Sequence, residues 1–319
     1  MNLSIHSKSP GFSVDMLSIP LKIGQEQSLF DKLFFGKLDV PEEIPISGYQ
    51  ISQNGIEITH YTEGGMEGLS QFFDLELFPL ADAPGQIPEL YISKKTFLLG
   101  TDKFGRDLLS RMLVGMRISL SIGFIAVLIS LIIGITLGSI AGYFGGKVDV
   151  AIIWLINVTW SIPTLLLVIA ITLALGKGYY QVFVAVGLTM WVEVARIVRG
   201  QVLGIKEMQY VTAARALGFN NFRILSRHIL PNSMAPVIII SAANFASAIL
   251  VESGLSFLGI GAQPPVPSWG GIIKDHYAYL LMGKPFLALI PGIAIMSLVM
   301  AFMLLGNAIR DAMDVRSSN

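Results

Sequence analysis

The sequence predicts an all-α, multi-pass membrane protein in which five membrane-spanning helices follow a polar N-terminal region. Of the 319 residues, 53% are hydrophobic and only 14% are charged, whereas a soluble domain carries about 25% charged residues. Five apolar runs lie between residues 118 and 310, and each is long enough to cross the roughly 30 Å hydrocarbon core of a bilayer as a helix. Residues 1–95 contain no such run and are interrupted by prolines. We therefore divide the chain into an extramembrane region and a membrane domain.

Composition and motifs exclude several other classes of protein. The formal net charge is +0 and the chain has no cysteine, so nothing indicates nucleic-acid binding, and disulfides and thiolate metal sites are excluded. The nearest approach to a nucleotide-binding loop is Gly145-Gly146-Lys147, but Val148 follows where that motif requires Ser or Thr. We expect no catalytic residue, no metal and no cofactor in this chain. If ATP drives the protein, a partner must bind it.

The N-terminal region, residues 1–95, carries one clear structural signal. Apolar residues alternate with polar ones in 49–51 and 56–58, on either side of Asn54-Gly55, which predicts a β-hairpin. His60 follows this pattern and is interpreted as a solvated strand histidine rather than a metal ligand. We expect a small, partly ordered polar region.

Residues 96–117 are predicted to form an amphipathic helix that lies in the membrane interface. Its apolar face would comprise Leu108, Leu109, Met112, Leu113 and Met116. Its polar face would comprise Arg106, Asp107, Ser110, Arg111 and Arg117. Asp107 and Arg111 are spaced for an ion pair one helical turn apart.

The five spans are predicted at residues 118–144, 150–175, 180–198, 233–258 and 286–309. In the first, Gly134, Gly138 and Gly142 recur every fourth residue and form a stripe suited to close helix contact. In the second, Pro163 removes a backbone hydrogen bond and is expected to kink the helix. In the third, Glu193 is expected to extend towards the interface or to pair with Arg196.

Residues 209–231, which we call the elbow, form the one substantial polar loop of the membrane domain. Residues 210–217 contain neither Gly nor Pro and predict a short helix, which Gly218 would end. Asn220 or Asn221 would cap a second short helix, which Pro231 would stop. Three arginines, at positions 215, 223 and 227, make the elbow basic. A compact, positively charged helix-turn-helix at the membrane surface is suited to docking another protein.

The elbow resembles the cytoplasmic loop motif of ABC importer permeases, EAA, three residues, G, nine residues, I-x-L-P. The matching positions are Ala213, Ala214, Gly218, Leu230 and Pro231. Thr212 and His228 replace the Glu and the Ile of the motif. In that family the loop is the coupling helix that fits a cleft on the ATPase subunit. The resemblance therefore implies an ATPase-coupling role for Ala213, Ala214, Arg215, Gly218, Leu230 and Pro231.

Two further segments resemble the oligopeptide, dipeptide and nickel branch of this family, and within it the C-type permease. They are GTDxxGRDxxSRxxxGxRxSL at residues 100–120 and GIGAQPPVPSWG at residues 259–270. The resemblance implies the type I ABC importer permease fold and a multi-pass location in the cell inner membrane. It also implies pairing with a second, homologous permease, two ATPase subunits that bind ATP, and an extracytoplasmic binding protein. Peptides, nickel complexes and glutathione all fall within the resemblance, and the translocation path stays unassigned.

The distribution of Lys and Arg predicts the orientation of the spans. With the elbow inside, one side collects Lys147, Arg196, Arg199, Lys206, Arg215, Arg223, Arg227, Arg310 and Arg316. The other side has Lys177, Lys274 and Lys284, apart from residues 96–117. We therefore predict a transmembrane domain at 118–310 with a cytoplasmic coupling loop at 199–231, a cytoplasmic tail at 311–319 and an extracytoplasmic region at 1–95. Because a polar region needs a preceding signal or span to cross a membrane, we expect a further membrane helix encoded upstream of Met1. The alternative is a five-span variant in which the N-terminal region crosses together with the first span.

Glu252 is an ionisable residue well inside the fourth span. An intramembrane carboxylate is a candidate functional group by default, so a secondary transporter that couples to an ion through Glu252 is the rival function. A membrane scaffold that recruits a soluble protein through the elbow is a third. We favour structural or gate-related hydrogen bonding by Glu252, at the outer interface, over ion coupling.

Overall fold

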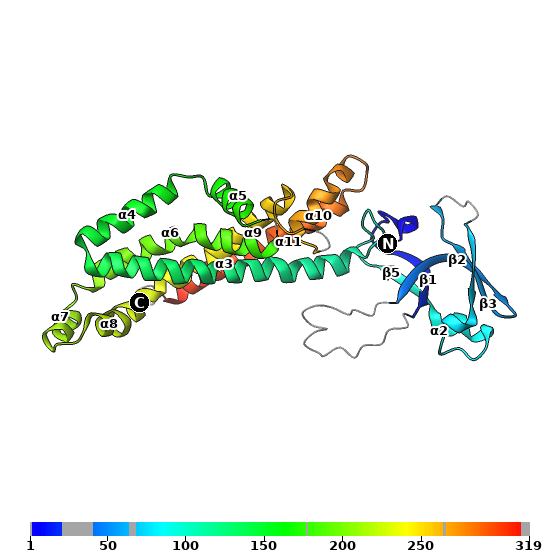
Figure 1. Ribbon diagram of the computed structural model, residues 1–319, viewed down its shortest axis with the longest axis horizontal. Helices are drawn as coiled ribbons and strands as arrows, with labels where there is room; N and C mark the ends of the chain where they lie inside the picture. The colour runs from blue at the N-terminus through cyan, green and yellow to red at the C-terminus, as the bar shows by residue number, and fades with distance from the viewer. Residues whose placement is uncertain (1, 21–40, 64–67, 177, 264–265, 314–319) are drawn as a thin grey trace. The chain divides into compact units, whose positions relative to one another are not determined.

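The computed structural model describes residues 2–20, 41–63, 68–176, 178–263 and 266–313. The chain forms two compact units, Met1–Arg111 and Met112–Asn319, and we describe each by itself (Figure 1). The first unit extends beyond residue 95, where we predicted the polar region to end. The first unit includes part of the segment at residues 100–120 that resembles peptide permeases. It ends at Arg111, in the first turn of the long helix Leu108–Phe144.

A five-stranded antiparallel sheet in the order β4-β3-β2-β1-β5 forms the first unit. The strands are β1 (Phe12–Ile19), β2 (Glu42–Ser52), β3 (Gly55–His60), β4 (Ser70–Asp74) and β5 (Ile92–Phe97). Helix α2 (Ile87–Tyr91) and short 3-10 turns at Leu3–Ile5, Leu75–Leu77 and Pro84–Gln86 complete it. Leu17, Ile56 and Phe78 belong to the larger apolar core, while Met16 belongs to a second cluster with Ile5 and Phe97. Adjacent residues of β1 thus reach different clusters, as the alternation of side chains along a strand requires.

The predicted hairpin is confirmed by the pairing of β2 with β3. Ser52 lies opposite Gly55 and Ile51 opposite Ile56, so the two-residue turn is Gln53-Asn54, one residue earlier than the predicted Asn54-Gly55. His60 ends β3, and its Nε2 lies 2.8 Å from Gln71 Oε1 on β4. The sequence predicted only this hairpin of the sheet, because β1 and β5 pair across a long stretch of chain and leave no local signal.

Residues 96–117 are not one separate helix, and this part of the prediction is corrected. Residues 97–107 close β5 and form a turn around the buried carboxylate of Asp102, which accepts from Phe104 N at 2.8 Å and Arg106 N at 2.9 Å. Arg111 Nε lies 3.3 Å from the same carboxylate. Asp107 accepts from Leu109 N and Ser110 N and so caps the helix that begins at Leu108. That helix, α3 (Leu108–Phe144), continues without a break into the first predicted span, since it contains no proline.

The second unit is helical. After α3 come α4 (Gly146–Trp160), α5 (Thr164–Leu175), α6 (Tyr179–Ile205), α7 (Gln209–Ala216), α8 (Asn221–Ile224), a π-helical turn (Leu225–Ile229), α9 (Leu230–Phe257), α10 (Trp269–His276), a 3-10 turn (Tyr277–Leu280) and α11 (Phe286–Met313). Among the described residues, 4 helices are long and apolar enough to cross a membrane, or 5 if α4 and α5 form one broken span. Four of the five predicted spans are confirmed as single helices, and the second falls on α4 and α5, which make the fifth span if they are taken together.

The second span is bent far more than the predicted kink at Pro163. Helices α4 and α5 meet at 91°, and Pro163 stands in an extended conformation directly before α5 (ψ 125°). Because proline has no N–H to donate and clashes with the preceding turn, the helix stops at Trp160 and restarts at Thr164. The bend leaves the backbone at 161–163 outside both helices.

The glycine stripe on α3 is confirmed as a close contact with α6. A Cβ atom at Gly138 would lie 2.5 Å from the carbonyl oxygen of Ala195, and one at Gly142 would lie 2.8 Å from Val202 Cβ. Real Cβ atoms essentially never approach that closely. Only glycine therefore lets α3 and α6 pack at this distance, as in other membrane helix pairs with small residues at the contact.

We expect Gly138→Leu to separate α3 from α6. Forcing side-chain atoms into a packed contact costs about 1–3 kcal/mol or more, so the variant should unfold at a lower temperature in detergent. Gly200→Leu on α6 is the matched control, because a Cβ there meets nothing within 4 Å. Equal unfolding temperatures for the two variants would contradict the stripe.

Candidate functional site

The first part of the elbow is α7 and the turn that ends it. Gly218 has a left-handed backbone (φ +77°), its N–H bonds to Arg215 O at 3.0 Å, and Phe219 N bonds to Ala214 O at 3.2 Å. This pair of bonds is the Schellman motif, which satisfies the last carbonyls of a helix and favours glycine at the left-handed position. The predicted helix end at Gly218 is confirmed.

The second part of the elbow begins as predicted but does not end as predicted. Asn220 caps α8, and its side-chain oxygen accepts from Arg223 N at 2.8 Å. Pro231 does not stop the helix: α8 continues through the π-helical turn Leu225–Ile229 into α9, which has proline in its first turn. A proline ring clashes with the carbonyl four residues earlier, and the wider π turn falls where that carbonyl, of Arg227, lies. The π turn therefore accommodates Pro231, and the helix continues.

The inner face of the elbow is built into the membrane unit. Val211, Ala214, Ile224 and Ile229 are buried in one apolar cluster with residues of α6 and α9. Tyr143 at the end of α3 donates its hydroxyl to Asn221 Oδ1 at 2.8 Å. The elbow is thus fixed to three long helices, and a force on it would reach all of them.

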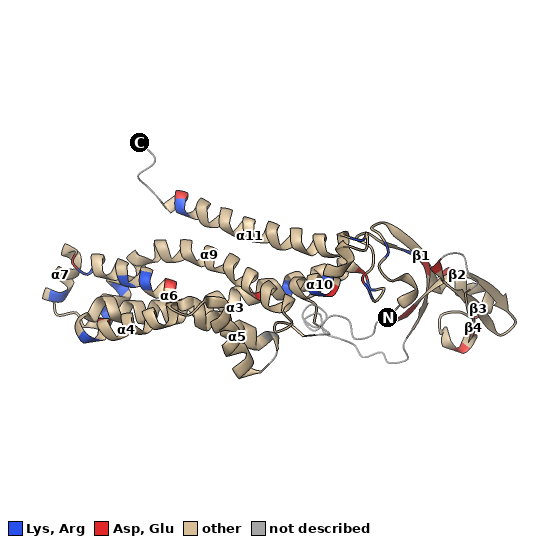
Figure 2. Ribbon diagram, turned by 90° about the horizontal axis from the view of Figure 1, so that it is seen from above, with Lys and Arg blue, Asp and Glu red and all other residues tan. Residues whose placement is uncertain are grey.

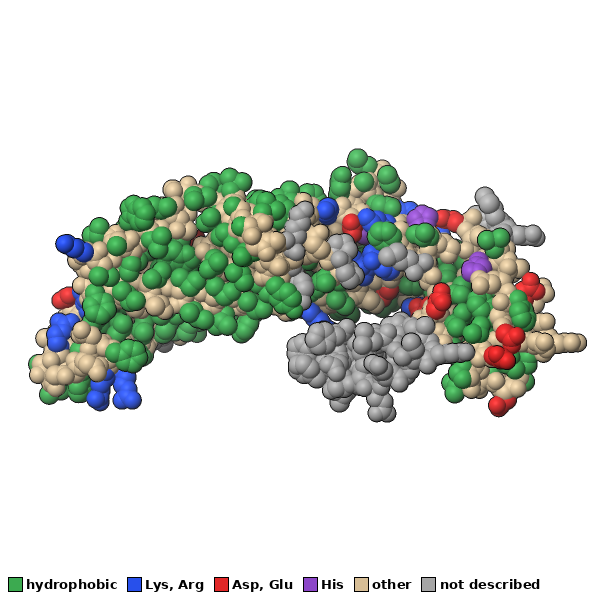
Figure 3. All heavy atoms as spheres, in the orientation of Figure 1, with side chains coloured by type: hydrophobic (Ala, Val, Ile, Leu, Met, Phe, Trp, Pro, Cys, Tyr) green, Lys and Arg blue, Asp and Glu red, His purple; other side chains and the backbone are tan. Residues whose placement is uncertain are grey.

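The outer face of the elbow is exposed, basic and apolar. Phe222 is 80% exposed and Leu217 is 74% exposed, and arginines 215, 223 and 227 are exposed beside them. Lys and Arg gather at this end of the unit (Figure 2), and blue and green side chains share its surface in Figure 3. The arginines were predicted from the sequence, but the exposed Phe222 and Leu217 were not. Both could have been predicted, because each is a large apolar residue inside a polar loop.

The predicted coupling residues fall on both faces of the elbow. Ala214 is buried and Leu230 is half-buried, both in the cluster that anchors the elbow. The remaining four, Ala213, Arg215, Gly218 and Pro231, are exposed. The motif therefore combines residues that fix the elbow with residues that face outwards.

An ion pair that was not predicted from the sequence joins α4 to α6 near the elbow. Arg199 donates to Asp149 through two nitrogens, Nε to Oδ1 at 2.5 Å and Nη2 to Oδ2 at 2.6 Å. Lys206, also on this side, donates to the carbonyl of Gly142 at 3.0 Å. These contacts join residues far apart in the sequence, so no spacing rule could have indicated them.

Glu252 lies in a cage of serine hydroxyls at the other end of the unit. It is fully buried, and Ser256 donates to its Oε1 at 2.7 Å. Ser119 of α3 and Ser253 lie 3.4 Å from Oε2. Glu252 thus joins α3 and α9 by hydrogen bonds, and it is completely buried. Its structural or gate-related role stays a prediction.

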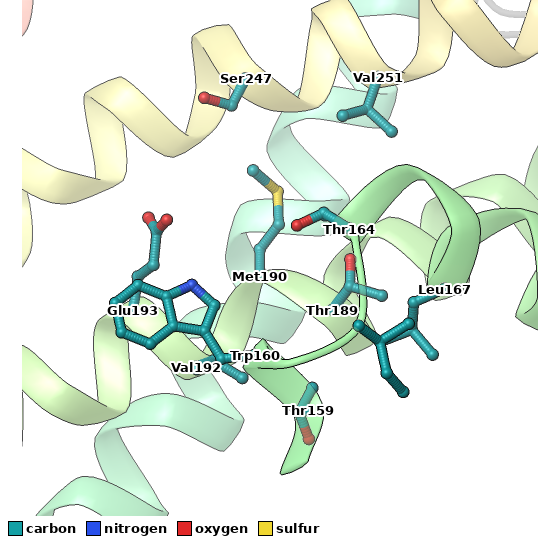
Figure 4. Close-up of a pocket in the computed structure, with 11 residues that line it drawn as sticks. Thr159, Trp160, Thr164, Leu167, Thr189, Met190, Val192, Glu193, Ser247 and Val251 are labelled. Atoms are coloured by element: carbon teal, nitrogen blue, oxygen red, sulfur yellow. The ribbon is translucent and has the colours of Figure 1, made fainter. Parts of the chain in front are cut away.

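A pocket of about 230 Å³ lies where the bend between α4 and α5 meets α6 and α9. Its lining combines Trp160, Met190 and aliphatic residues with three threonines, Ser247 and Glu193 (Figure 4). The carboxylate of Glu193 points towards α9 in this view. No pocket residue was predicted as a site, because the pocket depends on the bend at Pro163.

Residues 134–318 match the family described as binding-protein-dependent transport system inner membrane component. The chain belongs to this family. Among its relatives, a dipeptide transport system permease protein of Alkalihalophilus pseudofirmus is 41% identical over 215 residues, which is 67% of this chain and 70% of that protein. A glutathione transport system permease protein of Pectobacterium atrosepticum is 41% identical over 216 residues, covering 68% of this chain and 71% of that one.

The fold of this permease also matches solved structures. The membrane chain of the MetNI methionine ABC transporter, in an inward-facing conformation, aligns with a TM-score of 0.54 at 18% sequence identity, covering 64% of this chain and 97% of that chain. The likeness confirms the type I ABC importer permease fold predicted for the helical unit.

We expect Gly218→Val to disable the elbow without preventing membrane insertion. A non-glycine residue in the left-handed conformation costs about 1–2 kcal/mol, and a β-branched side chain tilts α7 away from α8. ATPase subunits should no longer co-purify with this variant. Gly218→Asn is the control, since Asn tolerates this conformation and should retain them. Unchanged co-purification of the Val variant would remove Gly218 from the site.

We expect Glu252→Gln to keep most transport activity. The amide retains one oxygen that accepts from the serines, whereas Glu252→Ala leaves buried hydroxyls unpaired, each at a cost of about 1–3 kcal/mol. Uptake and thermal unfolding of both variants test this: Gln should resemble the unaltered protein, and Ala should unfold earlier. A Gln variant that is folded but inactive would favour ion coupling.

Proposed function

We propose that this chain is the membrane-spanning permease subunit of an ATP-driven importer of peptides. The observation that carries the proposal is the exposed, basic elbow on a buried anchor, in a chain of the binding-protein-dependent transport family. Relatives at 41% identity are named as dipeptide and glutathione permeases, and both names indicate short peptides as solutes.

The subunit breaks no bond in its solute and acts with partners. We propose that it pairs with a second, homologous permease, that two ATPases dock on the two elbows and bind the ATP, and that an extracytoplasmic binding protein delivers the peptide. The elbow then faces the cytoplasm, in a cell inner membrane, and residues 1–95 are extracytoplasmic, as the sequence predicts. The gathering of Lys and Arg at the elbow end supports this orientation.

Coupling would proceed through the contacts already described. An ATPase that closes on Phe222, Leu217 and the arginines moves the elbow, and the cluster around Val211 and Ile224 transmits that motion to α6 and α9. Because α3 is packed against α6 through glycines, the three helices tilt together. The helices have an inward-open and an outward-open arrangement. When the ATPases bind one arrangement more tightly than the other, the translocation path opens to the corresponding side of the membrane.

Purification of the assembled importer tests the proposed function. ATPase subunits should co-purify with the chain, and a peptide with its binding protein should stimulate ATP hydrolysis. Peptide uptake that depends on an ion gradient and not on ATP would contradict the proposal. A chain that binds a soluble protein but transports nothing would identify a scaffold.

We expect Phe222→Asp to release the ATPases. The change removes an exposed aromatic anchor, a type of residue whose truncation at an interface costs about 2 kcal/mol or more, and adds a charge opposite to that of the arginines. The measurement is the ratio of ATPase to permease after purification. Leu281→Asp is the control, since Leu281 is 95% exposed near α10, at the opposite end of the unit. Equal ratios in the two variants would contradict the docking surface.

A further inference from the structure

Glu193 is a carboxyl side chain within a helix that is apolar enough to cross a membrane. It belongs to α6, whose apolar window has a mean hydropathy of 1.6. It is exposed, and among the described residues it forms no hydrogen bond or ion pair. A carboxylate in such a helix is costly and marks a partner or a substrate pathway. Its partner is therefore sought outside the chain's own side chains.

Arg196, the neighbouring cation, has other partners. Arg196, one turn along α6 from Glu193, was expected to pair with it. Instead its Nη2 donates to Asn157 Oδ1 of α4 at 2.8 Å, and its guanidinium stacks 3.6 Å from the ring centre of Trp160. Arg196 is thus held against α4, and the pairing expected from the sequence is not formed.

Two of the four hydroxyl groups that line the pocket, those of Thr159 and Thr189, can only accept hydrogen bonds from a ligand. Thr159 donates its proton to Leu155 O at 2.9 Å, and Thr189 donates to Val186 O at 2.8 Å. A hydroxyl that has donated its one proton has only lone pairs left for a ligand. The pocket therefore presents a negative charge and oxygen acceptors to whatever enters it.

We infer that this pocket binds the primary ammonium group of the transported solute, with Glu193 as its counter-charge. An ammonium group has three donors and no acceptor, which complements a carboxylate and acceptor hydroxyls. The volume of about 230 Å³ is below the roughly 300–1,000 Å³ of pockets that enclose a whole drug-sized ligand, so it fits one end of a solute. The inference rests on the proposed function, in which the solute is a peptide with a free amino terminus.

The test is uptake of a dipeptide with a free amino group by proteoliposomes that contain the assembled importer and its binding protein. Glu193→Gln should lower the initial rate about tenfold, equivalent to about 1.4 kcal/mol, with ATPase co-purification unchanged. Glu193→Asp keeps the charge and should retain most of the rate. Thr189→Val removes an acceptor and should lower the rate by a smaller factor.

Asp311→Asn is the matched control, since it neutralises an exposed carboxylate on α11, and it should transport at the unaltered rate. A Gln variant that transports like the unaltered importer would overturn the ammonium site while leaving the proposed function intact. Loss of the second permease from the purified Gln variant would also overturn it, because Glu193 would then meet a basic side chain of that subunit. Absence of any peptide uptake by the unaltered importer would overturn the proposed function itself, and the inference with it.

Discussion

The close contact between α3 and α6 is the interaction on which the helical unit depends. The glycines at 134, 138 and 142 place the backbone of α3 against side chains and carbonyls of α6, and neither helix could approach the other with larger residues there. From this pair the other parts follow: α6 leads directly into the elbow, it carries Glu193 and Met190 into the pocket, and its Arg199 holds α4. If α3 and α6 were packed less closely, α6 could move independently of α3, and the elbow and the pocket would move with α6.

A second constraint is the cost of polar groups in hydrocarbon. Backbone and side-chain polar groups within a bilayer are satisfied internally or face a water-filled space. The serine cage around Glu252, the double bond between Arg199 and Asp149, and the bond between Arg196 and Asn157 all obey it. Against this background Glu193 is an exception, since among the described residues it forms no hydrogen bond or ion pair. At the Pro163 bend the backbone obeys the same rule, since Ser161 N bonds to Asn157 O and Leu167 N bonds to Pro163 O.

The features that the sequence predicted are those fixed by local chemistry. Gly218 and Asn220 act on the backbone within three or four residues, so their turn and cap could be predicted from the residues alone. The spans follow from apolar composition, and the glycine stripe follows from a period of four. The features that were missed join distant residues: β1 pairs with β5, Asp149 meets Arg199, and the pocket needs four separate segments. Pro231 was misread for another reason, since the rule that proline stops a helix takes no account of a π turn that accommodates its ring.

That π turn has a consequence for how this region tolerates insertions and deletions. A π turn is an α-helix with one extra residue, and one residue rotates a helix by about 100°. Loss of a single residue from Leu225–Ile229 would leave a continuous α-helix, but it would turn Ile224 and the whole of α8 around the axis of α9. Phe222 would then face a different direction while every residue of the elbow motif was still present. The number of residues between the glycine and the proline of the motif therefore sets the direction in which the elbow presents its outer surface.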